Sequence, residues 1–98
     1  MAAYVLLAHP TAQKELDVLP TRIADGIRRV LAALAKSPRD PRFDLRALKA
    51  VDGEPPAMRL RVGEYRVILR IHHPEKEIRI ARIGHRSGIY RGVEHLDE

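Results

Sequence analysis

The apolar pattern of this 98-residue chain changes period once, and that change constrains the fold more than any other feature. Between residues 21 and 36 the apolar positions recur every three or four residues, which is the spacing of one helix face. These positions are Ile23, Ile27, Val30, Leu31 and Leu34. From residue 58 onward apolar residues instead alternate with polar ones, which is the period of a strand with one buried face. Helices are therefore predicted to precede a sheet.

Three alternating runs in the second half predict strands at 58–62, 65–71 and 78–83. In the first run Leu60 faces one side, while Arg59 and Arg61 face the other. Short turns at 63–64 and 72–77 join the runs. Consecutive strands joined by tight turns predict an antiparallel meander.

The first half of the chain is predicted to supply one strand and two helices. The apolar run 2–9 predicts a strand that joins the sheet at an edge. The segment 10–20 predicts a first helix, because Pro10 suits a first helical turn and apolar residues follow at helical spacing. The segment 45–56 contains turn residues and predicts no strand. We therefore expect one α+β domain, 1–98, in the order β-α-α-β-β-β, with two N-terminal helices packed on a four-stranded, mainly antiparallel sheet.

The composition excludes several classes of site. The chain has no cysteine, so it has neither disulfides nor thiolate metal ligands. His72 and His73 are adjacent in a predicted turn without a third ligand at a matching spacing, so we expect no metal and no cofactor. The sequence has no signal-peptide pattern, and no apolar run approaches the roughly 18 residues of a membrane span. We expect a cytoplasmic protein with no membrane partner.

Positive charge is concentrated in the second half. The whole chain has a formal net charge of +5, whereas residues 56–92 contain nine Arg or Lys and three Glu, which gives +6. Arginine outnumbers lysine by 14 to 4, and its planar fork suits phosphate groups. An arginine excess also follows from the base composition of some genomes, so composition alone leaves nucleic-acid binding open.

Two arginine-rich stretches are predicted to form one site. An unpaired buried charge is costly, so Arg59, Arg61 and Arg66 are expected on the sheet face that the helices leave open. Arg86 and Tyr90 follow the last predicted strand, and they are expected to fold back over that face.

The segments LKAVDG, MRLRVGEYRVIL and IARIGHRSGIYR resemble those of the RelE/ParE superfamily, the toxins of bacterial and archaeal type II toxin–antitoxin pairs. The predicted element order also fits, and the resemblance covers essentially the whole chain. The RelE branch implies a metal-free endoribonuclease that cleaves mRNA in the ribosomal A site and so inhibits translation. The implied partners are a RelB-like antitoxin, the ribosome and mRNA, with operator DNA as a target of the toxin–antitoxin complex.

The resemblance also implies roles for individual residues. The family's cationic strand pair corresponds to Arg59 and Arg61, although the best-known member has lysines there. Its hairpin arginine corresponds to Arg66. Its C-terminal arginine and tyrosine correspond to Arg86 and Tyr90. Several relatives also have a histidine at the position of His85. The expected catalytic residues are Arg61, Arg66, Arg86, Tyr90 and His85, and the expected RNA-binding residues are Arg59, Lys49 and Arg91.

Metal-free RNA cleavage uses the ribose 2′-OH as the nucleophile. It needs a base, an acid, and cations for the charge that builds on the phosphate. Each fixed cation is worth about 100- to 1,000-fold in rate. Arginine stays protonated near neutrality, so the expected base is Tyr90, with His85 as the alternative for either proton-transfer role.

Other interpretations fit the same residues. Arg59 and Arg61 also suit a solvated or antitoxin-facing surface, and Tyr90 also suits a packing role. Structural ion pairs are possible for Arg66 or Arg70 with Glu64 or Asp52. Two other functions also fit: a ParE-like inhibitor of DNA gyrase, whose branch generally lacks the ribonuclease residues, and an inactive module that binds only its antitoxin or DNA.

Overall fold

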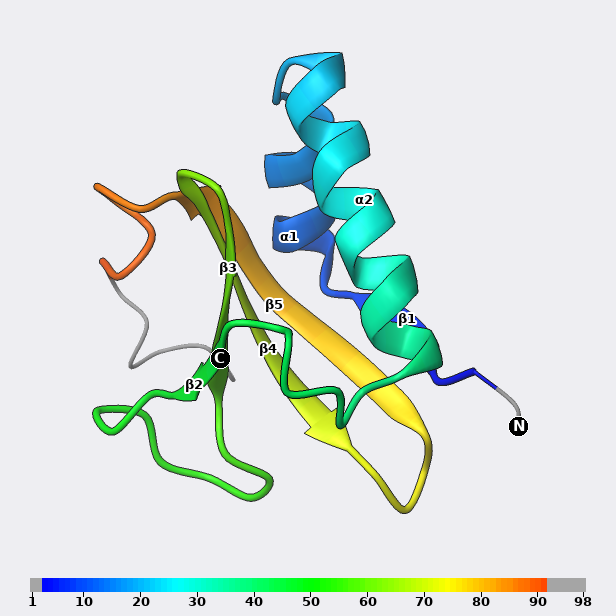
Figure 1. Ribbon diagram of the computed structural model, residues 1–98. Coiled ribbons are helices and arrows are strands. Elements are labelled where there is room, and N and C mark those ends of the chain that lie inside the picture. Colours follow the sequence, from blue (N-terminus) through cyan, green and yellow to red (C-terminus); the bar gives the residue numbers. More distant parts are fainter. Residues whose placement is uncertain (1–2, 92–98) are drawn as a thin grey trace.

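The computed structural model describes residues 3–91 (Figure 1). The two ends of the predicted domain 1–98, including Ala2 of the first predicted strand, lie outside the described residues. Two helices lie on one side of a single sheet, and the C-terminal segment, orange in Figure 1, lies on the other side. Among residues 3–91, neither helix has the length and hydrophobicity that crossing a membrane requires.

Five strands form the sheet in the order β1-β5-β4-β3-β2. They are β1 (Val5–Ala8), β2 (Leu45–Ala47), β3 (Met58–Val62), β4 (Tyr65–His72) and β5 (Glu77–His85). β1 runs parallel to β5, and the other neighbouring pairs are antiparallel. The predicted α+β class and the mainly antiparallel sheet are confirmed.

The sheet has five strands where the sequence predicts four. The additional strand is β2, which takes three residues from the segment expected to be irregular. It pairs with β3 in the register Leu45↔Leu60 and Ala47↔Met58. A period cannot be recognised over three residues, so this strand depends on its neighbour and not on a pattern of its own.

Helices α1 (Pro10–Asp17) and α2 (Thr21–Lys36) agree with the sequence prediction. Pro10 occupies the first turn of α1, where the backbone N–H of Thr11 donates to His9 Nδ1 at 3.1 Å. The apolar stripe of α2 faces the sheet and is most deeply buried at Ile27 and Leu34. The two helices therefore cover one face of the sheet.

The main core lies between the helices and that face. Leu60, Val67 and Leu69 from β3 and β4 are fully buried in it. The β4–β5 pairing contains a register shift, and this bulge places Ile80 and Ile83 on the same core face although they are three residues apart.

The opposite face is open only in part. Ile68 and Ile89 are almost completely buried, although neither belongs to the main core. A Cβ placed on Gly84 would lie 3.1 Å from Ile89 Cδ1. Gly84 alternates with the core residue Ile83, so that Cβ would point away from the helices. The segment after β5 thus folds back over this face at Ile89.

Candidate catalytic and RNA-binding site

The turn between β3 and β4 brings together two of the predicted arginines. Gly63 has a φ of 58°, a left-handed conformation that favours glycine. The turn sets Arg61 directly opposite Arg66. Nη1 of Arg66 donates to the carbonyl oxygens of Gly63 and Tyr65, each at 2.9 Å. The Arg61 side chain is exposed and bonds none of the residues that the structure describes.

Arg86 joins these two arginines through the same turn. Its backbone N–H donates to the Glu64 carbonyl oxygen at 2.9 Å, and its Nε donates to Glu64 Oε2 at 2.5 Å. The two side chains are 60% and 62% exposed. The hydrogen bond from Arg86, then its charge, lowers the pKa of the Glu64 carboxyl from its ordinary value of 4.5. We refer to Arg61, Arg66 and Arg86 as the hairpin cluster.

His85 lies next to the hairpin cluster, at the end of β5. It stands opposite Tyr65 in the β4–β5 register, and the two rings meet edge to face with centroids 5.4 Å apart. Its Nδ1 lies 2.9 Å from Ser87 Oγ and accepts a 3.2 Å hydrogen bond from the backbone N–H of Ser87. Tyr65 packs against the core.

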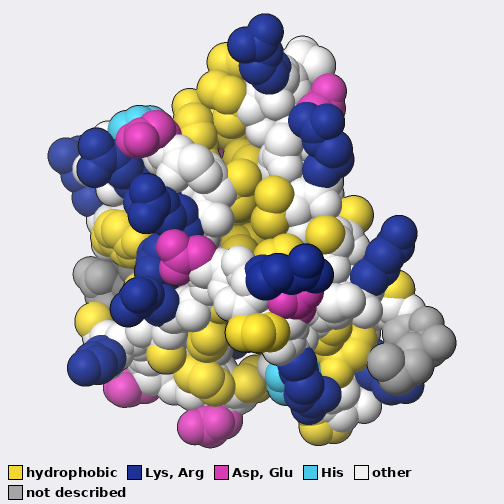
Figure 2. Space-filling model, in the orientation of Figure 1, with side chains coloured by type: hydrophobic (Ala, Val, Ile, Leu, Met, Phe, Trp, Pro, Cys, Tyr) yellow, Lys and Arg dark blue, Asp and Glu magenta, His cyan; other side chains and the backbone are white. Residues whose placement is uncertain are grey.

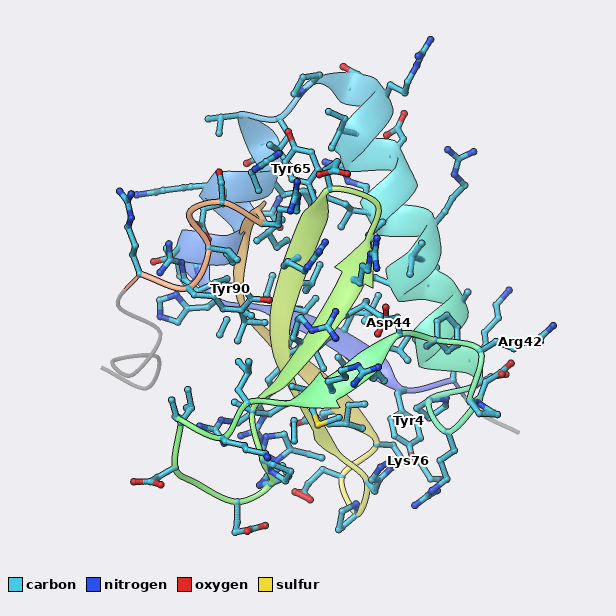
Figure 3. All side chains as sticks on the ribbon, turned by 60° about the vertical axis from the view of Figure 1, so that its left-hand side comes forward. Tyr4, Arg42, Asp44, Tyr65, Lys76 and Tyr90 are labelled. Atoms are coloured by element: carbon cyan, nitrogen blue, oxygen red, sulfur yellow. The ribbon has the colours of Figure 1, made fainter. Side chains whose placement is uncertain are left out.

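Arg59 is held more firmly than Arg61, although both lie on β3. Only 14% of its side chain is exposed, and its Nη2 lies 3.3 Å from Asp44 Oδ1. The same carboxylate oxygen lies 3.8 Å from Nε of Arg46, which pairs with Arg59 in the β2–β3 register. Figure 3 shows Asp44 beside β2. One carboxylate, that of Asp44, therefore lies close to two cations on adjacent strands.

Tyr90 and Arg91 lie on the C-terminal segment. Tyr90 is 42% exposed, which weakens a packing role for it. Figure 3 shows Tyr90 on that segment beside the sheet, whereas Tyr65 lies at the hairpin end. The Arg91 side chain is exposed, and its carbonyl oxygen accepts a 3.5 Å hydrogen bond from Arg82 Nη1.

Lys49 lies away from the hairpin cluster. It is exposed in the loop between β2 and β3, whose base is closed by a hydrogen bond from the Leu48 N–H to the Ala57 carbonyl oxygen. This loop joins β3 at Met58, the opposite end from the hairpin turn. Lys49 and the hairpin cluster are therefore separated by the length of β3.

Basic side chains gather along the side of the molecule formed by the hairpin and the C-terminal segment. Figure 2 shows Lys and Arg side chains in a run there, with acidic side chains between them. Two members of this surface were missed from the sequence. Arg46 was missed because β2 was not predicted, and its alternation with Leu45 and Ala47 was the available signal. Glu64 was considered only as a partner of Arg66 or Arg70, whereas its side chain bonds Arg86.

A hollow of about 560 Å³ lies elsewhere, lined in part by Leu7, Arg70 and Arg79. Its cations already have partners. Arg79 Nη2 lies 2.7 Å from Glu77 Oε1. Arg70 donates to the backbone carbonyl oxygens of Pro55 and Asp52, so Arg70 is paired structurally. This hollow contains none of the predicted site residues.

A family model described as the ParE toxin of the type II toxin–antitoxin system parDE matches residues 6–90. A chain of the archaeal RelE–RelB complex from Pyrococcus horikoshii is similar, with 25% identity and a TM-score of 0.73, over 89% of this chain and 99% of that one. A chain of the RelBE2 toxin–antitoxin complex from Mycobacterium tuberculosis is 26% identical, with a TM-score of 0.70, over 89% and 95% of the two chains.

A mutant of the Escherichia coli toxin RelE in the free state has the same fold. The TM-score is 0.61 at 18% identity, and the match covers 89% of this chain and 88% of that one. No curated protein sequence matches the chain at a significant level.

Proposed function

The chain belongs to the ParE toxin family of type II toxin–antitoxin systems, within the RelE/ParE superfamily, and from this premise we propose that it is a ribosome-dependent endoribonuclease. The proposed substrate is mRNA in the ribosomal A site, and its cleavage inhibits translation. The similar chains from RelE–RelB and RelBE2 complexes, at 25% and 26% identity, favour the ribonuclease branch of the superfamily.

The convergence of the hairpin cluster on one turn carries the proposal. Arg61 and Arg66 stand opposite each other across the hairpin, and Arg86 is bonded to the turn between them. Cations that are fixed before the reaction stabilise developing negative charge without reorganisation. Three arginines at one end of the sheet therefore suit a phosphate that gains charge in a transition state.

In the proposed reaction the ribose 2′-oxygen bonds to the adjacent phosphorus as its proton passes to a base. The bond between phosphorus and the 5′-oxygen then breaks, and that oxygen takes up a proton. The products are a 2′,3′-cyclic phosphate and a 5′-hydroxyl. The hairpin cluster stabilises the extra negative charge on the phosphorane oxygens, and no metal ion takes part.

Tyr90 is the proposed base, and His85 is the alternative for base or acid. Tyr90 is an exposed residue, which suits contact with RNA. His85 is exposed and precedes Arg86 directly in the chain, so its imidazole adjoins the hairpin cluster. Arginine cannot accept the proton near neutrality, so the proton transfer falls to one of these two groups.

The remaining basic residues are proposed to bind the RNA backbone. Arg59 lies on β3 two residues before Arg61, Arg91 lies on the C-terminal segment, and Lys49 lies in the loop between β2 and β3. Contacts of this kind fix the position of a nucleic acid without reading its sequence.

Primer extension on mRNA in a translation reaction, with and without ribosomes, tests the proposal. We expect cuts within codons in the A site that appear only when ribosomes are present. Cuts on naked RNA alone would contradict the ribosome dependence, and the absence of cuts would contradict the ribonuclease.

Inhibition of DNA gyrase is the second candidate, and the name of the matching family model favours it. Retention of Arg66, Arg86 and Tyr90 on one chain favours the ribonuclease. A supercoiling assay with purified gyrase separates the two, because we expect no inhibition at concentrations that cleave mRNA. A chain that is inert in both assays would be a module that binds only its antitoxin or DNA.

We expect the partner to be a RelB-like antitoxin encoded next to this chain, as RelB accompanies RelE in the similar complexes. The excess of +6 over residues 56–92 favours an acidic or mixed-charge segment that orders on binding. A single domain in the cytoplasm, where translation occurs, is consistent with this function, and the toxin–antitoxin complex is proposed to bind operator DNA. Affinity measurements with the products of the two adjacent genes test the partner.

A further inference from the structure

We propose that Glu64 is an internal counter-ion, which occupies the phosphate-binding side of Arg86 until an RNA phosphate displaces it. The proposal rests on the proposed function, because it names the group with which the RNA competes. It concerns the β3–β4 turn, where one carboxylate lies among the cations of the hairpin cluster.

Glu64 holds Arg86 through two separate contacts. The backbone contact joins the Arg86 N–H to the Glu64 carbonyl oxygen at 2.9 Å, and the side-chain contact joins Arg86 Nε to Glu64 Oε2 at 2.5 Å. A substitution of the Glu64 side chain removes only the second contact. Arg86 therefore stays at the turn while its guanidinium becomes available.

The three members of the hairpin cluster differ in their acceptors. Arg66 donates to neutral carbonyl oxygens, and Arg61 bonds no described residue. Within residues 3–91, Arg86 is the member that bonds a carboxylate. A carboxylate oxygen presents the same acceptor chemistry to a guanidinium as a phosphate oxygen does, so Glu64 stands in for the substrate's phosphate.

The contact between Glu64 and Arg86 is of a kind that a ligand can displace. Both side chains are more than half exposed, at 60% and 62%. An exposed ion pair is weak because water and salt screen it. An RNA phosphate that also contacts Arg61 and Arg66 competes with a single carboxylate for Arg86. The RNA therefore displaces Glu64, but the competition lowers the affinity of the protein for RNA.

The test measures the dissociation constant of a short 2′-O-methyl oligoribonucleotide, which lacks the nucleophile and is not cleaved. Wild type is compared with Glu64→Gln, Glu64→Asp, Arg86→Ala and the double variant of Glu64→Gln with Arg86→Ala, at low and moderate salt. Glu77→Gln is the control, because it also removes one charge and breaks a partly exposed ion pair, that with Arg79.

We expect Glu64→Gln to tighten binding roughly two- to fivefold, the range that exposed ion pairs are worth. Glu64→Asp should bind as wild type does, because it keeps the charge. In the Arg86→Ala background, Glu64→Gln should give no gain, since no guanidinium is released. Glu77→Gln should tighten binding less than Glu64→Gln.

An equal gain with and without Arg86 would overturn the proposal, because the effect would then be general electrostatics. Weaker binding by Glu64→Gln would also overturn it and would make Glu64 a residue that positions Arg86. If wild type cleaves mRNA and Glu64→Gln gains nothing, only this inference fails. If the binding gain appears in a chain that does not cleave mRNA, the proposed nuclease activity is wrong and the proposed role of Glu64 is supported. No binding by any variant overturns this inference alone, because cleavage on programmed ribosomes tests the nuclease separately.

Discussion

Two sets of arginines on the same sheet differ in how firmly the fold holds them. Arg82 on β5 donates from Nε and Nη2 to the carboxylate of Glu15 on α1, at 3.1 and 2.9 Å, and both side chains are about three-quarters buried. That carboxylate also accepts the Ile83 backbone N–H at 3.0 Å. In the hairpin cluster, by contrast, Arg86 is 60% exposed and has one replaceable partner.

The difference separates structural arginines from those available to a ligand. Glu15 raises the pKa of Arg82 through its hydrogen bonds. The pairing of β5 with β1 ends at Ile80, and beyond it the Glu15 carboxylate accepts the backbone N–H of Ile83. Breaking this contact leaves partly buried polar groups unpaired. Breaking the contact of Arg86 leaves two solvated charges. Only the second kind of contact can be exchanged for an RNA phosphate without a cost to the fold.

The largest expected effect is the loss of cleavage in Arg86→Ala. We expect the single-turnover rate on programmed ribosomes to fall by at least about 100-fold, the value of one fixed cation at the developing charge. The thermal midpoint should change little, because an exposed ion pair contributes little to stability and alanine keeps the backbone bond to Glu64. Arg79→Ala is the control, since it also removes an arginine and a partly exposed ion pair and should cleave as wild type does. Equal rates for Arg86→Ala and wild type would remove Arg86 from the mechanism.

The next effect separates the two candidates for proton transfer. Tyr90→Phe keeps the ring and removes the hydroxyl, so we expect a fall of about 100-fold in the cleavage step if Tyr90 is the base. His85→Gln should have a smaller effect. A phenol base gains activity as pH rises above 7, whereas an imidazole base levels off near its own titration. Single-turnover rates from pH 6 to 9 decide between them, and an inactive His85→Gln beside an active Tyr90→Phe would reverse the roles.

A third effect should fall on stability and spare cleavage. Arg82→Ala breaks the partly buried contact with Glu15, and we expect the free energy of unfolding to fall by about 1 to 3 kcal/mol. Denaturant melts measure this loss, and Glu15→Gln should lose less because its amide oxygen still accepts the Ile83 N–H. Cleavage per folded molecule should be unchanged. A loss of cleavage without a loss of stability would give Arg82 the same role as the hairpin cluster. The distinction between structural and ligand-binding arginines would then be wrong.

Sequence reasoning succeeded where the pattern lies within one element. The helix repeat of α2 and the alternation in β3 and β4 each fix a buried face over several residues, so their bounds and orientation were predictable. β2 was not predictable, because its three residues acquire strand geometry only beside β3. The bulge in β5 also breaks the simple alternation on which strand faces are inferred.

For the site, sequence reasoning supplied residue types but not their partners. The pairing of Glu64 with Arg86 joins residues 22 positions apart, and it follows from the antiparallel β4–β5 register and not from local spacing. Arg70 donates to the backbone carbonyl oxygens of Pro55 and Asp52, contacts that have no sequence signature. Whether these arginines act on RNA stays a prediction.

The smallest expected effect is on the pH dependence of stability at the hairpin turn. The pKa of Glu64 is lowered in the folded chain by the hydrogen bond from Arg86. A carboxyl with a lowered folded pKa stabilises the fold at pH values above its unfolded pKa, and this contribution is lost as pH falls through the folded value. The window therefore lies below about pH 4.5, the ordinary value for this group.

Glu64→Gln does not titrate in that window, so the difference in thermal midpoint between wild type and this variant should shrink as pH falls from 7 to 3. The change should be small because the pair is exposed. Arg86→Ala provides the control, because without the guanidinium the Glu64 carboxyl loses the main cause of its lowered pKa, and the pH-dependent part of the difference should disappear in that background. If the thermal midpoints of wild type and Glu64→Gln differ by the same amount from pH 7 to 3, then Glu64 does not bond Arg86 in solution. Arg86 would then be as accessible as Arg61, and the hairpin cluster would have no internal competitor for the RNA phosphate.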